Sequence, residues 1–146
     1  MDKQKVQNNH TGCNFNVKIE PVEINGNFSS VSGLGAEIEY EEYSEGGNFI
    51  SPIYLPKRVK YSNIVLQRGT VTEEPLIDWF TDVRGGKLLR YPMIITMMDE
   101  KRVPVKIWTV MDAMPVKLEY TPLDAMSHDI FTTTVEFVHG EIIHVK

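Results

Sequence analysis

The sequence has little cysteine: of its 146 residues, only Cys13 carries a thiol. A single cysteine excludes a disulfide framework within the chain, so packing must hold the fold, and it suits assembly in a reducing cytoplasm. Long apolar runs are also missing, and none approaches the roughly 18 residues that a membrane-spanning helix needs. Residues 1–7 are charged and polar, which is not the pattern of a secretory signal peptide. We expect a protein that has no membrane span and is assembled in the cytoplasm.

An excess of basic charge is missing as well. The 15 Lys and Arg residues are outnumbered by 20 Asp and Glu residues, which gives a formal net charge of −5. A nucleic-acid backbone would therefore meet a mostly repulsive field. Lys57, Arg58 and Lys60 stand beside Tyr54 and Tyr61, a combination found in nucleic-acid grooves, but three basic residues in an acidic chain favour a solvated strand end or a subunit contact.

Motifs for catalysis, cofactors and metals are the third absence. Ser127, His128 and Asp129 have the residue types of a serine triad, but neighbours on an extended chain point to opposite faces and cannot form a relay. Residues 33–35 fall short of a dinucleotide-binding fingerprint. The four histidines are His10, His128, His139 and His144. No two of them have a spacing typical of metal sites. The prediction is a non-enzyme with no catalytic residues, no cofactor and no metal.

What the sequence does contain is alternation of apolar and polar residues with a period of two, which indicates half-buried strands. It is clearest at Phe15, Val17 and Ile19 and again over residues 89–97. Further strands are expected over residues 28–31, 37–43, 58–67, 103–107, 116–120, 129–138 and 141–145. We place turns at residues 25–26 and 99–102 and a long connection at residues 45–56.

One helix is predicted over about residues 73–84. Thr72 can cap it, Glu73 and Glu74 favour its positive end, and the glycines at 85–86 end it. About eight strands around one helix predict a mainly β fold, a closed or nearly closed antiparallel β-barrel or sandwich with one packed α-helix. Residues 1–13 lack periodicity and are expected to form a flexible N-terminal arm, followed by a single barrel domain over residues 14–146.

An acidic run is the first candidate for a functional surface. Alternate positions on a strand place up to three carboxylates on one face. We consider two interpretations, an exposed sheet face or a negatively charged wall of a lumen, for Glu37, Glu39, Glu41 and Glu42.

An apolar loop over residues 47–56 is the second candidate. Such a loop must pack against its own barrel or against a neighbouring subunit, and we predict the neighbour. The predicted inter-subunit contacts are Phe49, Ile50, Ile53, Tyr54 and Leu55.

Residues 55–69, with Leu76 and Trp79 behind them, resemble the tail-tube protein family of contractile phages and phage-tail-like contractile injection systems. The same family is matched in order by residues 15–19 and 28–34 before that block, and by residues within 99–108, 113–117 and 135–140 after it. The resemblance thus covers nearly the whole chain from Phe15 onward. Lys57 departs from it, since family members often carry glycine there.

The resemblance implies a β-barrel with a side helix, a fold shared with the inner-tube ring protein of type VI secretion. It further implies six-membered rings that stack into a hollow tube for DNA or protein cargo, with residues 45–56 reaching toward an adjacent ring. The implied partners are further copies of the chain, a sheath protein, baseplate and tube-initiator proteins, a tube terminator and cargo in the lumen. Assembly in the bacterial cytoplasm would lead to a virion tail or an injection particle.

Three alternatives stay open at this point. Within the family, the chain could be a tube-initiator or baseplate ring paralogue, or a type VI secretion ring protein. Outside it, a monomeric ligand-binding β-barrel would need a concave apolar pocket.

Overall fold

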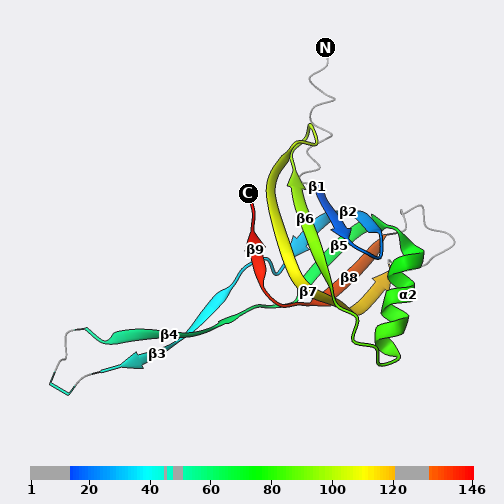
Figure 1. Ribbon diagram of the computed structural model, residues 1–146. Helices are drawn as coiled ribbons and strands as arrows, with labels where there is room; N and C mark the ends of the chain where they lie inside the picture. The colour runs from blue at the N-terminus through cyan, green and yellow to red at the C-terminus, as the bar shows by residue number, and fades with distance from the viewer. Residues whose placement is uncertain (1–13, 45, 48–50, 121–131) are drawn as a thin grey trace, which may run out of the picture.

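The computed structural model of the chain describes residues 14–44, 46–47, 51–120 and 132–146. The predicted N-terminal arm at residues 1–13 and the Ser-His-Asp run at residues 127–129 lie outside these ranges. Two predicted contact residues, Phe49 and Ile50, lie outside them too. Within the described part, the chain forms nine strands and one helix (Figure 1).

Six strands close into an antiparallel barrel. They are β1 (Asn14–Ile19), β2 (Ile24–Ser32), β5 (Ile64–Val71), β6 (Tyr91–Met98), β7 (Pro104–Tyr120) and β8 (Thr133–Val138). The strands pair in the order β6-β1-β2-β5-β8-β7, and an additional pairing of β6 with β7 closes the circle. The predicted barrel with one packed helix is therefore confirmed.

Three strands lie outside the closed circle. The short β9 (Ile142–His144) pairs with β7 at the edge of the barrel sheet. The other two, β3 (Glu37–Tyr43) and β4 (Ile53–Lys60), form a separate two-stranded antiparallel sheet. In the sequence, β3 and β4 lie between β2 and β5, whereas in the barrel β2 and β5 pair directly with each other.

The barrel interior is filled by every second side chain of the barrel strands, those that point inward. Val17 and Ile19 of β1 lie beside Ile95 and Met93 of β6, and all four are buried. The rest of the buried apolar cluster consists of Ile24, Phe28, Ile64, Leu66, Leu76, Trp79, Val110, Ala113, Val135 and Phe137. Burial of this continuous cluster is the main favourable term that stabilises the fold.

The helix α2 (Glu73–Arg84) has the predicted bounds and lies on the side of the barrel away from β3 and β4 (Figure 1). Its Leu76 and Trp79 are buried, and Trp79 Nε1 donates a hydrogen bond to the Leu89 carbonyl at 2.9 Å. Thr72 does not cap the helix with its side chain as predicted; its hydroxyl donates to the Asn25 carbonyl at 3.0 Å and ties the helix start to β2. Among the described residues, no helix is long and apolar enough to cross a membrane.

Four local predictions are wrong. Residues 58–67 do not form one strand, because β4 ends at Lys60 and β5 begins at Ile64 in the other sheet. The first turn lies at residues 20–23, not 25–26, because Ile24 pairs with Ile19 and takes a place in the core. The last part of the predicted connection at residues 45–56, residues 53–56, belongs to β4, which begins at Ile53 and pairs with β3. Residues 116–120 are the end of the long strand β7, which continues through Asp112 in a left-handed conformation with φ +54°.

Candidate functional site: a projecting hairpin

Strands β3 and β4 form a ribbon that extends away from the barrel (Figure 1), called here the projecting hairpin (residues 37–60). Its pairing runs from Glu37 opposite Lys60 at the barrel end to Tyr43 opposite Ile53 at the far end. All eight side chains of β4 are exposed. An isolated two-stranded sheet is marginally stable in water. The projecting hairpin thus presents apolar side chains that the barrel of the same chain does not cover.

One side of the ribbon, the apolar face, carries few charges. Directly opposed residues of antiparallel strands lie on the same side, which joins Ile38 to Val59 and Tyr40 to Pro56. The rings of Tyr40 and Tyr54 meet edge to face with centroids 5.4 Å apart. Ile38, Tyr40, Tyr54 and Val59 are 56%, 64%, 57% and 48% exposed, and Ile38, Tyr40, Tyr54 and Pro56 line a shallow hollow.

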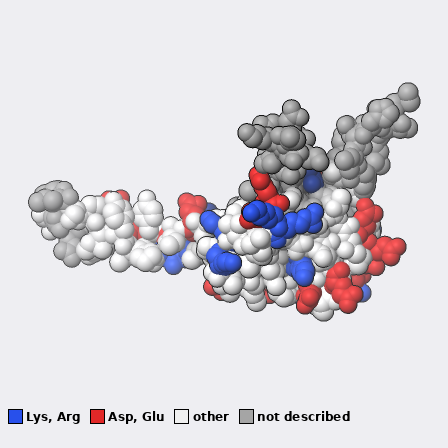
Figure 2. Space-filling model, turned by 90° about the horizontal axis from the view of Figure 1, so that it is seen from above, with Lys and Arg blue, Asp and Glu red and all other residues white. Residues whose placement is uncertain are grey.

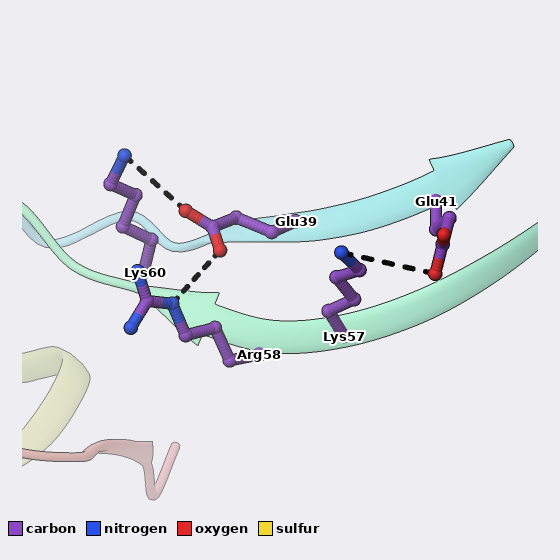
Figure 3. Close-up of polar contacts among 5 residues, drawn as sticks. All are labelled: Glu39, Glu41, Lys57, Arg58 and Lys60. Atoms are coloured by element: carbon purple, nitrogen blue, oxygen red, sulfur yellow. Dashed lines mark hydrogen bonds and ion pairs between the residues drawn. The ribbon is translucent and has the colours of Figure 1, made fainter.

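The opposite side, the charged face, carries a ladder of ion pairs near the barrel (Figure 3). The Glu39 carboxylate accepts a hydrogen bond from Arg58 Nε at 2.9 Å and lies 3.4 Å from Lys60 Nζ. Lys57 Nζ lies 3.8 Å from the Glu41 carboxylate. The hydrogen bond from Arg58, followed by that from Lys60, lowers the pKa of Glu39 from its ordinary value.

Two members of the acidic run, Glu39 and Glu41, therefore form one cross-strand ladder with the basic residues Lys57, Arg58 and Lys60. Glu37, Glu39 and Glu41 share the charged face, whereas Glu42 is opposed to Tyr54 and lies on the apolar face. Figure 2 shows the hairpin as a mostly uncharged ribbon, with basic and acidic side chains where it joins the barrel and a few acidic ones farther out. All four carboxylates belong to the hairpin; that they line a lumen stays a prediction.

The predicted contact residues divide between the two faces. Tyr54 belongs to the apolar face, whereas Ile53 and Leu55 lie on the charged face beyond the ion pairs, opposed to Tyr43 and Glu41. Their exposures of 57%, 47% and 48% leave all three available for contact.

Sequence reasoning missed Ile38, Tyr40 and Val59, which supply much of the apolar face. A signal for them was present: a hairpin folded around the glycines at 46–47 would bring β3 against residues 53–60, so that Glu39 and Glu41 meet the basic side chains of β4.

A closed barrel from which a long, uncovered apolar ribbon projects defines a structural subunit shaped for contact with other protein chains. More specifically, the chain belongs to the family of the T4-like virus tail tube protein gp19, whose sequence model matches residues 11–143. This is a family of structural tube proteins, and the chain is a component of a phage tail or a phage-tail-like injection particle.

Solved structures with the same fold come from contractile injection systems. A chain of the anti-feeding prophage baseplate is 26% identical, with a TM-score of 0.71 and coverage of 91% of each chain. A chain of the sheath-tube complex of an extracellular contractile injection system, PVC, shares the fold at 23% identity and a TM-score of 0.71, over 90% of this chain and 87% of that one. Hcp1 from Flavobacterium johnsoniae shares the fold at 12% identity and a TM-score of 0.52, over 90% of this chain and 94% of that one. No curated protein sequence matches the chain.

Proposed function

We propose that the chain is the inner-tube subunit of a contractile particle and acts without catalysis. Six copies form a ring, the rings stack into a hollow tube, and DNA or protein cargo passes through the lumen. The proposed partners are the sheath, the baseplate with its tube initiator, and the tube terminator. Assembly takes place in the bacterial cytoplasm.

The observation that carries this proposal is the uncovered apolar face of the projecting hairpin. Fully burying a large apolar side chain stabilises by about 1.5–3 kcal/mol, so a half-exposed one has roughly 1 kcal/mol still to gain. Ile38, Tyr40, Tyr54 and Val59 each have that gain available on contact with a second copy. Ordering costs reduce the net gain per contact, but a closed ring repeats each contact at every subunit.

As far as its described residues show, the barrel interior is too full to hold a small ligand. The interior void lined by Val17, Phe28 and Phe137 among others measures only about 10 Å³. Ligand pockets in proteins measure about 300–1,000 Å³. The filled interior supports a structural role over a monomeric ligand-binding barrel.

The decisive experiment compares self-association of the unaltered chain with a Tyr40→Asp, Tyr54→Asp variant by negative-stain electron microscopy over a concentration series. The charged side chains would be buried without partners in any contact through the apolar face, so we expect rings or tubes from the unaltered chain and none from the variant. The matched control, Tyr40→Phe with Tyr54→Phe, keeps the rings and should assemble. Monomers of the unaltered chain at every concentration, or full assembly of the Asp variant, would contradict the proposal.

A second candidate within the family is a tube-initiator or baseplate ring subunit. The similarity to a chain of the anti-feeding prophage baseplate at 26% identity favours considering it. The same micrographs separate the two roles, because an initiator on its own should stop at single rings, whereas a tube subunit extends into tubes of many rings.

A further inference from the structure

The direction in which the hairpin projects is set where two short links join it to the barrel. Residues 33–36 lead from β2 into β3, and residues 61–63 lead from β4 into β5. The links touch backbone to backbone, because a Cβ on Gly33, which has φ +90°, would lie 2.1 Å from the Asn63 carbonyl oxygen. Any group that anchors the second link to the barrel therefore also fixes the first.

His139 is such a group. It follows β8, and its Nε2 lies 2.8 Å from the carbonyl oxygen of Ser62, in the second link. Its Nδ1 lies 2.7 Å from the carbonyl oxygen of Gly140. The Gly140 amide in turn donates to the Met111 carbonyl at 2.8 Å, which ties this turn to β7. A single imidazole thus spans from the hairpin link to the barrel wall.

The two contacts of His139 have an unusual chemical requirement. A carbonyl oxygen only accepts hydrogen bonds, and a neutral imidazole has only one N–H to donate. With a neutral ring, one ring nitrogen would turn its lone pair toward a carbonyl oxygen less than 3 Å away. Only the protonated ring, with an N–H on both nitrogens, satisfies both contacts.

We propose that His139 is a positioning residue: in its protonated, two-donor form it clasps the Ser62 link to the Gly140 turn and fixes the direction of the projecting hairpin. When the ring loses a proton, whichever nitrogen keeps its N–H, the other turns a lone pair toward a carbonyl oxygen, so the ring is no longer held in the orientation that bridges Ser62 and Gly140 and the link is held less firmly. The hairpin then samples a wider range of directions relative to the barrel.

The titratable groups around the clasp come from three segments. Tyr61, in the same link as Ser62, packs its ring on His139 with centroids 5.5 Å apart. Asp112 of β7 lies beside the turn, since its Oδ2 would be 3.3 Å from a Cβ on Gly140, and Glu141 follows the turn. Lys60 precedes the link but is engaged with Glu39. Asp112 thus places a carboxylate beside the Gly140 turn, on the barrel side of the clasp.

The clasp matters for assembly because the direction of the hairpin decides where its apolar face meets another copy. That consequence depends on the proposed function, whereas the clasp is a property of one chain. It can therefore be tested on monomers, at concentrations below those at which the chain associates.

The test uses the full chain with Cys13→Ser and two engineered cysteines for spin labels, Glu42→Cys on the hairpin and Lys18→Cys on the barrel. Distances between the labels are measured by pulsed electron spin resonance at about pH 5.5 and about pH 8.5, on either side of the range where imidazole ordinarily titrates. We expect a narrow distribution at the lower pH that broadens at the higher pH. His139→Phe keeps the ring and removes both donors, so its distribution should be broad at both.

His144→Phe is the matched control, because His144 is the other described histidine and its ring stacks on Trp108 of β7, with no contact to Ser62 among those of the described residues. It should respond to pH as the unaltered chain does. Nitrogen NMR of the unaltered protein supplies a readout that needs no His139 variant: both His139 ring nitrogens should be protonated when the distribution is narrow.

A narrow distribution that ignores pH, or a neutral His139 ring in the narrow state, would overturn the clasp. If the distance distribution narrows at low pH in a chain that never forms rings, the clasp is supported and the proposed function is contradicted. The two failures are therefore distinguishable.

Discussion

Gly69 shows how closely single residues are fitted inside the barrel. The ring of Phe28 lies across its backbone, and a Cβ at this position would fall 2.1 Å from Phe28 Cδ1. Phe28 is buried and has no open side to move into, so Gly69→Ala should destabilise the fold by about 1–3 kcal/mol through overpacking. Thermal and urea unfolding of the dilute protein would show the loss.

The control for this prediction is Gly35→Ala, because a Cβ there meets no atom within 4 Å. Its unfolding transition should stay within experimental error of the unaltered chain or move slightly upward. Equal stability of the Gly69 and Gly35 variants would mean that Phe28 is free to move away from Gly69.

Local signals made some of these residues predictable and others not. The helix bounds follow from Glu73, Glu74 and the glycines behind Arg84, whose effects act within one turn. The turn at residues 25–26 was mispredicted because an Asn-Gly pair favours a turn locally, yet the gain from burying Ile24 opposite Ile19 outweighs that preference. The His139 clasp joins residues 77 positions apart, and no local pattern signals it.

At the scale of elements, the projecting hairpin depends on its charged ladder. Lowering of the Glu39 pKa, first by the Arg58 hydrogen bond and then by Lys60, means that the folded hairpin favours the carboxylate. The stability that the ionised Glu39 contributes is fully present above the ordinary Glu pKa of about 4.3. It is lost as the pH falls through the lowered pKa of the folded state. We therefore expect the hairpin to loosen in acid, below about pH 4, before the barrel does.

Amide chemical shifts of β3 and β4 followed during an acid titration would measure this loosening. Glu39→Gln should loosen the hairpin already at neutral pH and remove most of the acid response. Glu42→Gln, on the apolar face, is the matched control and should leave the response in place. Identical titrations of the two variants would assign the acid response to another group.

Strand β4 was the element least predictable from sequence, for a physical reason, whereas β3 has the predicted bounds of residues 37–43. Strand prediction relies on one face being buried, and β4 is exposed along its whole length and contains Pro56. Its first residues, Ile53, Tyr54 and Leu55, therefore show no regular alternation and were interpreted as a loop, whereas its last residues were assigned to a strand over residues 58–67. The same exposure that hid the strand is what makes the hairpin a candidate interface.

At the scale of the whole molecule, we expect the stability of the barrel not to depend on the hairpin. Among the described residues, the buried apolar cluster contains none from β3 or β4, so these two strands add nothing to the core. Replacing residues 37–60 by a short Gly-Ser linker should leave a folded barrel, because β2 and β5 pair directly and need only a short connection between Ser32 and Ile64. The melting temperature of the dilute protein should change little.

The shortened barrel should also be unable to assemble, since it lacks the apolar face of Ile38, Tyr40, Tyr54, Pro56 and Val59. Sedimentation of this variant and of the unaltered chain at increasing concentration would test this. The control is a second variant that keeps the hairpin but carries the linker in place of residues 99–102, the polar turn between β6 and β7. Assembly of the hairpin-free barrel would show that the contacts between copies lie on the barrel wall, and unfolding of it would show that the two sheets stabilise one another.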